Sequence, residues 1–310
     1  MYKGQKIAVA VPAYNEEKLI GEVIKTMPPL VDLIVIVDDQ SADRTFDIAS
    51  KSTDPRVIAI RHEKNTGVGG AIMTAHHRIL EEGADIAVVM AGDGQMDPDY
   101  LPALLNPIAD DGYDYAKGNR FWSEDSLRGM PRYRVFGNVV LTFMTKMASG
   151  YWNLFDPQNG YTAIRTDALK ELPLGDIRQG YVFENDMLIH LNIANKRIKD
   201  VAIPAKYGNE QSSIKLWKII PQFMNFLTWR YFHRIYHKYV LQSFSPIALF
   251  LLSGFLLTAW GIGFGIWVIV QTIGPATAST GTVILSVIPF MTGFQLLLAA
   301  LVLDIIAEPK

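Results

Sequence analysis

Short, nearly continuous apolar runs alternate with amphipathic stretches in the first third of the chain. The runs at residues 6–11, 33–37, 57–60 and 86–89 are rich in β-branched residues and lack polar alternation, which is typical of strands buried on both faces. Helical patterns fill residues 16–26, 43–50 and 70–80 between them. This order predicts an α/β domain with right-handed crossovers and a mainly parallel sheet. Ligands of such sheets bind beyond the carboxyl ends of the strands, so we expect the chemistry in the strand-to-helix turns.

The end of the chain has a different pattern, with two long apolar runs at residues 246–270 and 282–303. As a helix, the first run is about 37 Å long, enough to cross the hydrocarbon core of a bilayer. A short segment of small and polar residues, 274–281, joins the two runs. The pattern predicts a transmembrane hairpin. The alternative is a pair of core helices in a large domain, but no other segment could surround them.

Composition supports a soluble domain followed by a membrane segment. Hydrophobic residues make up 49% of the 310 residues and charged residues 19%, yet only three charged residues follow position 238. The net charge of −2 and the pI near 6.3 argue against a nucleic-acid binder. The absence of cysteine excludes disulfides, thiolate zinc sites and cysteine nucleophiles, and fits a reducing compartment. Pro12 interrupts the N-terminal apolar run and acids follow it, which indicates a first strand and not a signal peptide.

Basic residues precede the first apolar run, and no acid occurs between positions 215 and 238. They are Lys215, Lys218, Arg230, Arg234 and Lys238. The positive-inside rule then places the large domain and both termini in the cytoplasm of a cell-membrane protein. Polar residues at intervals of three and four among aromatic residues predict amphipathic helices that face anionic lipid. The alternative is a helix that packs on its own domain. We therefore expect a catalytic domain at 1–215, juxtamembrane helices at 216–240 and the hairpin at 241–310.

Polar and glycine-rich turns follow each of the four predicted strands. They are PAYNEE at 12–17, DDQSADRT at 38–45, NTGVGGA at 65–71 and AGDGQMDP at 91–98. Ser41 and Asp97 are expected as helix caps. Paired acids at one strand end with a further acidic turn nearby indicate a nucleotide and a hard cation. The glycine run does not match the dinucleotide pattern, because Ile72 stands where the last glycine belongs, and it predicts a close-approach turn that opens a helix.

In this order, the four turns resemble those of family 2 glycosyltransferases, whose nucleotide-sugar-binding domain has a GT-A-like fold. The likeness covers roughly residues 6–215. The middle of the chain resembles the polyprenyl-phosphate branch, which includes the dolichyl-phosphate mannose synthases. The matching motifs are GNR at 118–120, DPQNGY at 156–161 and FEND at 183–186.

The resemblance implies a site for a nucleotide sugar and a divalent cation. The donor would be held by Pro12, Tyr14, Glu16, Asp38 and Asp39. Asp93 and Gln95 match the family's metal-proximal acid and glutamine, also contact the donor, and would bind Mg²⁺ or Mn²⁺. Asp93 would also take part in catalysis. The usual DxDxQ pattern is incomplete, since Ala91 replaces its first acid. A cation held mostly by substrate phosphates and water remains compatible with this pattern.

For the acceptor, the resemblance implies a lipid phosphate bound by cationic and polar side chains. Arg120 is expected to place this phosphate and to take part in catalysis, with Arg134 and Asn138 in support; as an alternative, Arg134 is a surface charge. Glu184 and Asp186 take the place of catalytic or sugar-contacting acids, or alternatively are acids favoured at a helix N-terminus. The likeness also gives donor-binding roles to two residues of a closing loop. These are Lys206 and Ser212.

The expected activity is inverting transfer of one hexose from a nucleotide sugar to a polyprenyl phosphate, dolichyl or undecaprenyl, at the cytoplasmic membrane face. The donor could be GDP-mannose, UDP-glucose or a UDP-N-acetylhexosamine. Expected partners are the nucleotide sugar, the lipid phosphate, the membrane and further copies of the chain, with no nucleic acid. One alternative is a polysaccharide synthase, although the sequence has no QxxRW motif and only two spans. The other is a non-catalytic membrane partner, which Ala91 alone favours.

Overall fold

The computed structural model describes residues 1–120, 132–204, 216–273 and 277–310, without the side chains of 132–136, 138 and 216–220. It divides into two compact units. Unit 1 comprises residues 1–230 with the last two residues, and unit 2 comprises Tyr231–Glu308. The helix α8, Leu216–Ile235, therefore contributes to both units, and the boundary between the units falls inside the predicted juxtamembrane segment 216–240.

Unit 1 is built on one sheet, in which the described strands have the order β3-β2-β1-β4-β6-β5-β7. The strands are β1 (Ile7–Ala13), β2 (Leu33–Asp38), β3 (Val57–Arg61), β4 (Ile86–Val89), β5 (Tyr115–Asn119), β6 (Thr162–Arg165) and β7 (Ile198–Ala202). Only β6 is antiparallel to its neighbours among these strands. The prediction of a mainly parallel α/β sheet is confirmed, and the four predicted strands match β1 to β4 within two residues at either end.

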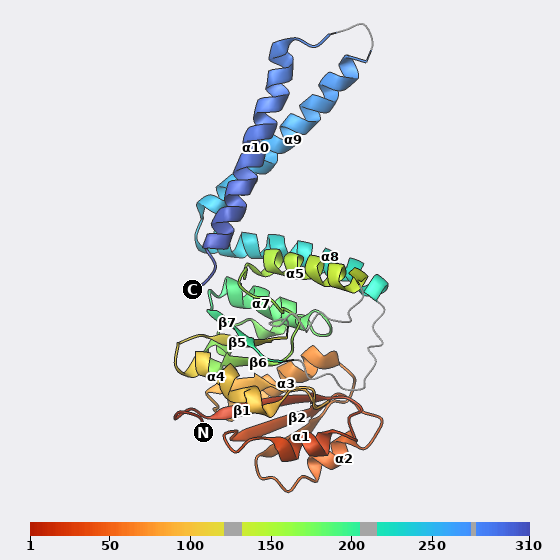
Figure 1. Cartoon of the computed structure of the whole chain (residues 1–310), viewed down its shortest axis with the longest axis vertical. Coiled ribbons are helices and arrows are strands. Elements are labelled where there is room, and N and C mark those ends of the chain that lie inside the picture. The colour runs from red at the N-terminus through yellow and green to blue at the C-terminus, as the bar shows by residue number, and fades with distance from the viewer. Residues whose placement is uncertain (121–131, 205–215, 274–276) are drawn as a thin grey trace. The chain divides into compact units, whose positions relative to one another are not determined.

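Helices cover both faces of the sheet (Figure 1). In β1 and β2, alternate residues of the continuous apolar runs enter opposite cores, as the period of a strand requires. One core includes α3 (Gly67–Glu81) and α7 (Phe183–Ile193), and the other includes α1 (Ile20–Thr26) and α4 (Leu101–Ala109). The remaining α-helices described within unit 1 are α2 (Thr45–Ser50), α5 (Arg132–Ser149) and α6 (Thr166–Lys170). Because β1 and β2 are in parallel register, Pro12 lies beside Val37, and their turns leave the sheet at the same edge.

The first two helices begin later than predicted, at Ile20 and Thr45, because the turns before them bond to each other. Asn15 N–H donates to Ser41 Oγ at 2.8 Å, so Ser41 links two turns and is not the expected helix cap. At the start of α2, Thr45 N–H donates to Asp43 Oδ1 at 3.0 Å instead. Asp97 does cap a short 3-10 helix, η1 (Pro98–Tyr100), as predicted.

The described part of α8 in unit 1 has a buried and an exposed face. Phe223, Leu227 and Arg230 are buried, while Met224 and Trp229 are exposed. The buried residues, at intervals of four and three, therefore pack on the domain, which is the alternative considered for this helix. Met224 and Trp229 lie on the other face. Arg230 lies on the buried face, where its guanidinium forms an ion pair with Asp186 inside the domain.

Unit 2 contains a π-helix, η4 (Tyr236–Gln242), and the two long helices α9 (Pro246–Gln271) and α10 (Thr280–Ile306), which run side by side (Figure 1). Both long helices are sufficiently long and apolar to cross a membrane, in agreement with the predicted hairpin. Gly293 lets them approach closely, since a Cβ there would lie 2.5 Å from a backbone nitrogen of α9.

Two basic residues that precede the first long helix, Arg234 and Lys238, are buried within unit 2. Arg234 is fully buried and donates to both oxygens of Asp304 at 2.8 Å, with Tyr239 O–H donating to the same carboxylate at 2.6 Å. A buried cation in or beside a membrane segment requires such a partner, because the charge is costly there.

Candidate active site

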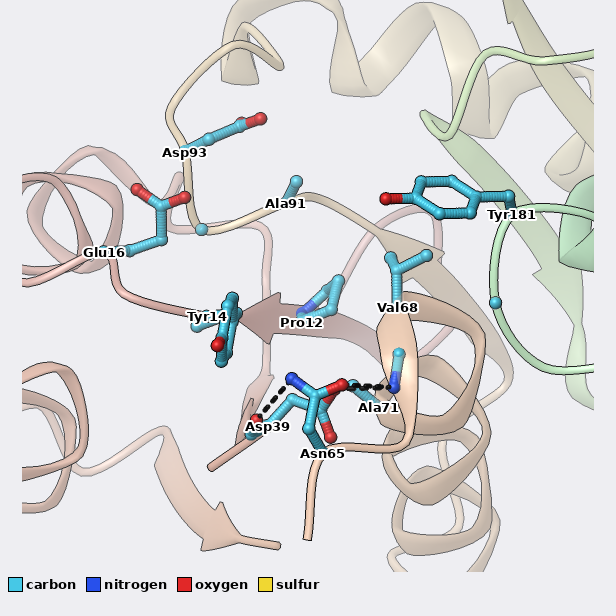
Figure 2. A pocket seen from close by; sticks show the side chains of 14 residues that line it. Pro12, Tyr14, Glu16, Asp39, Asn65, Val68, Ala71, Ala91, Asp93 and Tyr181 are labelled. Carbon is cyan, nitrogen blue, oxygen red and sulfur yellow. Dashed lines mark hydrogen bonds between the residues drawn. The ribbon is translucent and has the colours of Figure 1, made fainter. Parts of the chain in front are cut away.

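A cavity of about 420 Å³ lies at the carboxyl ends of β1, β2 and β4, where the sequence predicted the ligand site (Figure 2). This volume is in the range of pockets that bind nucleotide-sized ligands. The residues that line it are Pro12, Ala13, Tyr14, Glu16, Asp39, Asn65, Gly67, Val68, Ala71, Ala91, Gly92, Asp93, Gly180 and Tyr181. We call it the donor cavity. The turns after β1 to β4 all reach it, and so does a more distant segment before α7.

Asp39 is held rigidly at one side of the donor cavity (Figure 2). Its carboxylate accepts hydrogen bonds from Gly67 N–H at 2.7 Å and from Thr66 N–H at 2.8 Å, and His62 Nδ1 lies 2.8 Å away. Burial alone would raise the pKa of Asp39, but the hydrogen bonds from Thr66, His62 and Gly67 outweigh it and lower the pKa. Asp39 is therefore a fixed anionic acceptor for the N–H or hydroxyl groups of a ligand.

Asp38 has a different place from the one expected. Its side chain is buried and does not line the donor cavity. Instead, the carboxylate lies 3.3 Å from Arg61 Nε and accepts the N–H of Ser41. The two acids have different environments, because the side chains of successive residues at a strand end point in opposite directions. Asp39 faces the ligand, and Asp38 stabilises the turn.

Asp93 and Glu16 lie on the same side of the donor cavity, and Figure 2 shows both carboxylates there with Ala91 on the neighbouring wall. Asp93 Oδ1 accepts the N–H of Gln95 at 3.0 Å, which orders the turn after β4. Gln95 is exposed and lines a second cavity. Among the described residues, no group of three His, Asp or Glu side chains is arranged to hold a metal ion.

A second cavity of about 110 Å³ adjoins this region, and Asp93 lines both. Its other lining residues are Gln95, Met96, Asp97, Arg120, Asn159, Gly160, Tyr161, Ile203 and Pro204. We call it the acceptor cavity. Arg120, directly after β5, is oriented by Asp156: its Nε and Nη2 donate to the carboxylate at 2.7 and 3.1 Å, and its backbone N–H donates at 3.2 Å. Asp156 is 1% exposed and Arg120 38%, so a buried anion holds a cation that remains accessible to a ligand.

Behind this cavity, Lys117 and Glu184 form a charged region. Lys117 is fully buried on β5 and donates to the carbonyl of Asn159; burial lowers its pKa to about 8, although Glu184 and Asp156 oppose the shift. Burial also raises the pKa of Glu184, against the influence of Lys117 and Arg120. A Cβ on Gly160 would lie 3.9 Å from Glu184 Oε1, so the predicted acid borders the acceptor cavity through this glycine.

Asp186 lines neither cavity, in contrast to the expected sugar contact. It is fully buried, accepts Arg230 Nη2 at 2.5 Å and Arg178 N–H at 2.7 Å, and burial raises its pKa despite these partners. Arg134 and Asn138 lie in α5, but their side chains are outside the description. Lys206 and Ser212 are outside the described residues.

Sequence reasoning missed Tyr181, whose exposed ring projects toward the donor cavity opposite Asp93 (Figure 2). The signal was the glycine run at 67–70. It does open α3, as predicted, and the close approach is made by the chain itself. A Cβ on Gly69 would lie 2.8 Å from Phe183, and one on Gly67 would lie 3.3 Å from Gly180. These glycines admit the segment that carries Tyr181.

Comparison with known proteins agrees with this geometry. The family model described as "Glycosyl transferase family 2" matches residues 8–173, more than half of the chain. The chain belongs to this family. The protein is therefore a glycosyltransferase, and its α/β domain is GT-A-like.

Several relatives carry the names of enzymes that act on polyprenyl phosphates. A UDP-N-acetylglucosamine–dolichyl-phosphate N-acetylglucosaminyltransferase from Methanococcus voltae is 38% identical over 181 residues, covering 54% of this chain and 72% of the relative. An undecaprenyl-phosphate mannosyltransferase from Micrococcus luteus is 31% identical over 205 residues, covering 64% and 82%. Among solved structures, glucosyl-3-phosphoglycerate synthase from Mycobacterium tuberculosis with Mn²⁺, UDP-glucose and phosphoglyceric acid shares the fold, with a TM-score of 0.57, 23% identity and coverage of 74% and 80%. The Methanococcus and Micrococcus relatives are consistent with the polyprenyl-phosphate branch of the family.

Proposed function

We propose that this glycosyltransferase moves a single hexose from a nucleoside-diphosphate sugar to a polyprenyl phosphate, with inversion at the anomeric carbon. The observation that carries the proposal is the position of Asp93 on the wall common to two cavities, one of which holds Arg120 against a buried carboxylate. A donor in the first cavity and an anionic acceptor in the second would meet at Asp93. The names of the Methanococcus and Micrococcus relatives support this substrate class.

The donor cavity suits a nucleotide sugar because its two ends differ in chemistry. At one end, Asp39 accepts hydrogen bonds and fits the base or ribose. At the other, Asp93 and Glu16 stand where a diphosphate and its cation would lie. Tyr14 and Tyr181 are exposed aromatic residues at the cavity, with surfaces on which a base or sugar can stack. Uracil and guanine both carry ring N–H donors that would satisfy Asp39.

The acceptor phosphate needs orientation more than deprotonation. The second pKa of a phosphate monoester lies near 6, so the group is largely a dianion at neutral pH. Arg120 would place one phosphate oxygen in line with the anomeric carbon, and effective positioning of this kind lowers the barrier substantially. That oxygen forms the new bond to the anomeric carbon as the bond to the nucleoside diphosphate breaks. One displacement of this type inverts the configuration.

A divalent cation fits the donor set at Asp93. One carboxylate there, a second from Glu16 on the same side and the amide of Gln95 provide hard oxygen ligands, and Mg²⁺ usually takes its remaining ligands from phosphates and water. When bound, the cation would neutralise charge on the leaving diphosphate. The Mn²⁺ in the Mycobacterium structure supports this assignment, and Ala91 means that the substrate contributes more of the ligands.

We further propose that the reaction takes place at the cytoplasmic face, with both termini on that side. The two apolar helices and the basic residues before them support this orientation. Burial of Arg230 and Arg234 does not weaken this argument, since the positive-inside rule acts through charge on segments near the helix ends during insertion.

The test uses the full chain in detergent with Mg²⁺ or Mn²⁺, a short polyprenyl phosphate and a panel of radiolabelled GDP- and UDP-sugars. We expect label from one donor in the organic phase and the inverted anomer in the product by NMR. Asp93→Asn should abolish transfer because the cation that neutralises the leaving diphosphate loses its carboxylate ligand. Asp99→Asn, which neutralises an exposed acid a few residues away, is the matched control.

Failure of every donor to label lipid, with nucleotide binding intact by calorimetry, would overturn the acceptor assignment. Near-normal activity of Asp93→Asn would overturn the metal assignment. The orientation is checked separately, by labelling of single cysteines introduced at residue 278 and at the C-terminus in intact cells. An impermeant reagent added outside the cells is expected to label the cysteine at position 278 but not the one at the C-terminus.

A further inference from the structure

The segment 177–182, before α7, forms one wall of the donor cavity, and we call it the donor loop. It contributes Gly180 and Tyr181 to the cavity lining. On one side it packs against the glycine run that opens α3. A Cβ on Gly67 would lie 3.3 Å from Gly180 Cα, and one on Gly70 would lie 3.2 Å from Gln179 Oε1. The position of Tyr181 therefore depends on how this loop is held.

Three hydrogen bonds link the other side of the donor loop to α8. Asp186 accepts the backbone N–H of Arg178, inside the loop, at 2.7 Å. The same oxygen, Oδ2, accepts Arg230 Nη2 at 2.5 Å. Arg230 Nη2 also donates to the carbonyl of Asp176, immediately before the loop, at 3.1 Å. Arg230 is 4% exposed and Asp186 is fully buried, so the bridge is shielded from water.

A buried ion pair of this kind is a poor way to gain stability, because desolvation of both charges offsets their attraction. An apolar pair would join α8 to α7 at least as well. What the charges add is direction: the guanidinium meets a carboxylate and a carbonyl at once, and the carboxylate fixes a single loop N–H. This geometry specifies one loop conformation.

We propose that Arg230 is a positioning residue for donor binding, which acts through Asp186 on the donor loop and so couples α8 to the nucleotide-sugar site. The inference rests on the proposed function for the identity of the ligand. The same helix presents Met224 and Trp229 on its exposed face, the kind of surface that enters a lipid headgroup layer. Displacement of α8 would thus change the loop that carries Tyr181.

The test compares Arg230→Gln, Asp186→Asn and the double variant in the full chain, with Asn225→Ala as the control from the exposed face of α8. Hydrogen exchange measures the backbone of residues 177–182, and calorimetry measures binding of UDP and GDP. We expect faster exchange in the loop but not in α4, and a nucleotide dissociation constant raised about tenfold, a usual size for coupling between linked sites. The double variant should bind nucleotide no more weakly than the single variant with the lower affinity.

The outcomes distinguish a structural role of Arg230, a failure of the proposed function and a true positioning role. A lower melting temperature of Arg230→Gln with unchanged loop exchange and nucleotide affinity would show that the bridge is only structural. Faster loop exchange in a protein whose wild type binds neither nucleotide would refute the proposed function and leave the positioning of the loop supported. If Arg230→Gln does not fold, the isosteric Asp186→Asn decides by the same two measurements. At saturating donor, the KM for lipid phosphate should match that of the control.

Discussion

Replacement of Asp156 by Asn tests whether Arg120 acts as an oriented cation for the acceptor. Asn has nearly the same volume, so the buried position stays filled. It has one acceptor oxygen where the carboxylate has two, and its NH₂ group cannot accept a hydrogen bond from the guanidinium. One of the two side-chain hydrogen bonds, at 2.7 and 3.1 Å, is therefore lost together with the charge.

The size of the effect follows from this geometry. A hydrogen bond to a charged group contributes ~1.5–3 kcal/mol, which corresponds to about tenfold to 100-fold in a rate or affinity. Arg120 is 38% exposed, so water replaces part of the lost interaction and the lower end applies. We expect kcat/KM for the lipid phosphate to fall about tenfold, while the donor dissociation constant stays within a factor of about two.

Initial rates over a matrix of donor and acceptor concentrations separate the two substrates. Asp32→Asn is the matched control, because that carboxylate bonds Ile7 N–H at the opposite end of β1 from the cavities. An acceptor kcat/KM equal to that of the control would refute the orienting role of Asp156. An equal loss for donor and acceptor would move Arg120 toward the diphosphate.

Three further changes test other parts of the structure. His76 is fully buried, and burial lowers its pKa to about 4 from an ordinary value near 6.5, so the unfolded chain binds more protons than the folded one between these values. The free energy of unfolding should fall by about 3 kcal/mol as pH decreases through this window; His76→Leu should remove that slope in urea unfolding at several pH values, and an identical slope would contradict the assignment. Ala91→Asp restores a second carboxylate beside Asp93, so half-maximal activity should require several-fold less Mn²⁺ in a metal titration, and an unchanged requirement would place the cation elsewhere. Gly293→Val should lower the melting temperature in detergent because its Cβ would lie 2.5 Å from a backbone nitrogen of α9, whereas Gly263→Val, with no atom within 4 Å of its Cβ, should not.

Continuous apolar runs predicted the first four strands because burial on both faces leaves a strong local signal. The donor cavity followed from them, since parallel strands end at one edge of the sheet and bring their turns together. Pro12, Asp39 and Asp93, which the turns predict at one site, line one cavity. The hairpin is predicted equally well from the sequence, because the length and hydropathy of a segment indicate a membrane span.

The missed features depend on contacts between distant segments. The motif FEND indicates that Asp186 is a site acid, yet its carboxylate pairs with Arg230, which is 44 residues away. Tyr181 had no pattern around it, and only the glycines of α3 reveal that its loop must approach. The basic residues near the membrane were interpreted by charge alone, whereas α8 alternates a buried and an exposed face that composition does not show.

Electrostatics gives an additional reason to favour an anionic acceptor over a sugar hydroxyl. A hydroxyl nucleophile needs a general base with a pKa near the working pH, placed against its proton. Here Asp156 is occupied by Arg120, and Glu184 stands behind Gly160 with Lys117 nearby. Two cations so close to the acceptor cavity would attract a phosphate, whereas Glu184, whose pKa is raised by burial, is separated from the cavity by Gly160. The nearby cations therefore favour an anionic nucleophile, which supports a lipid phosphate as the acceptor in this cavity.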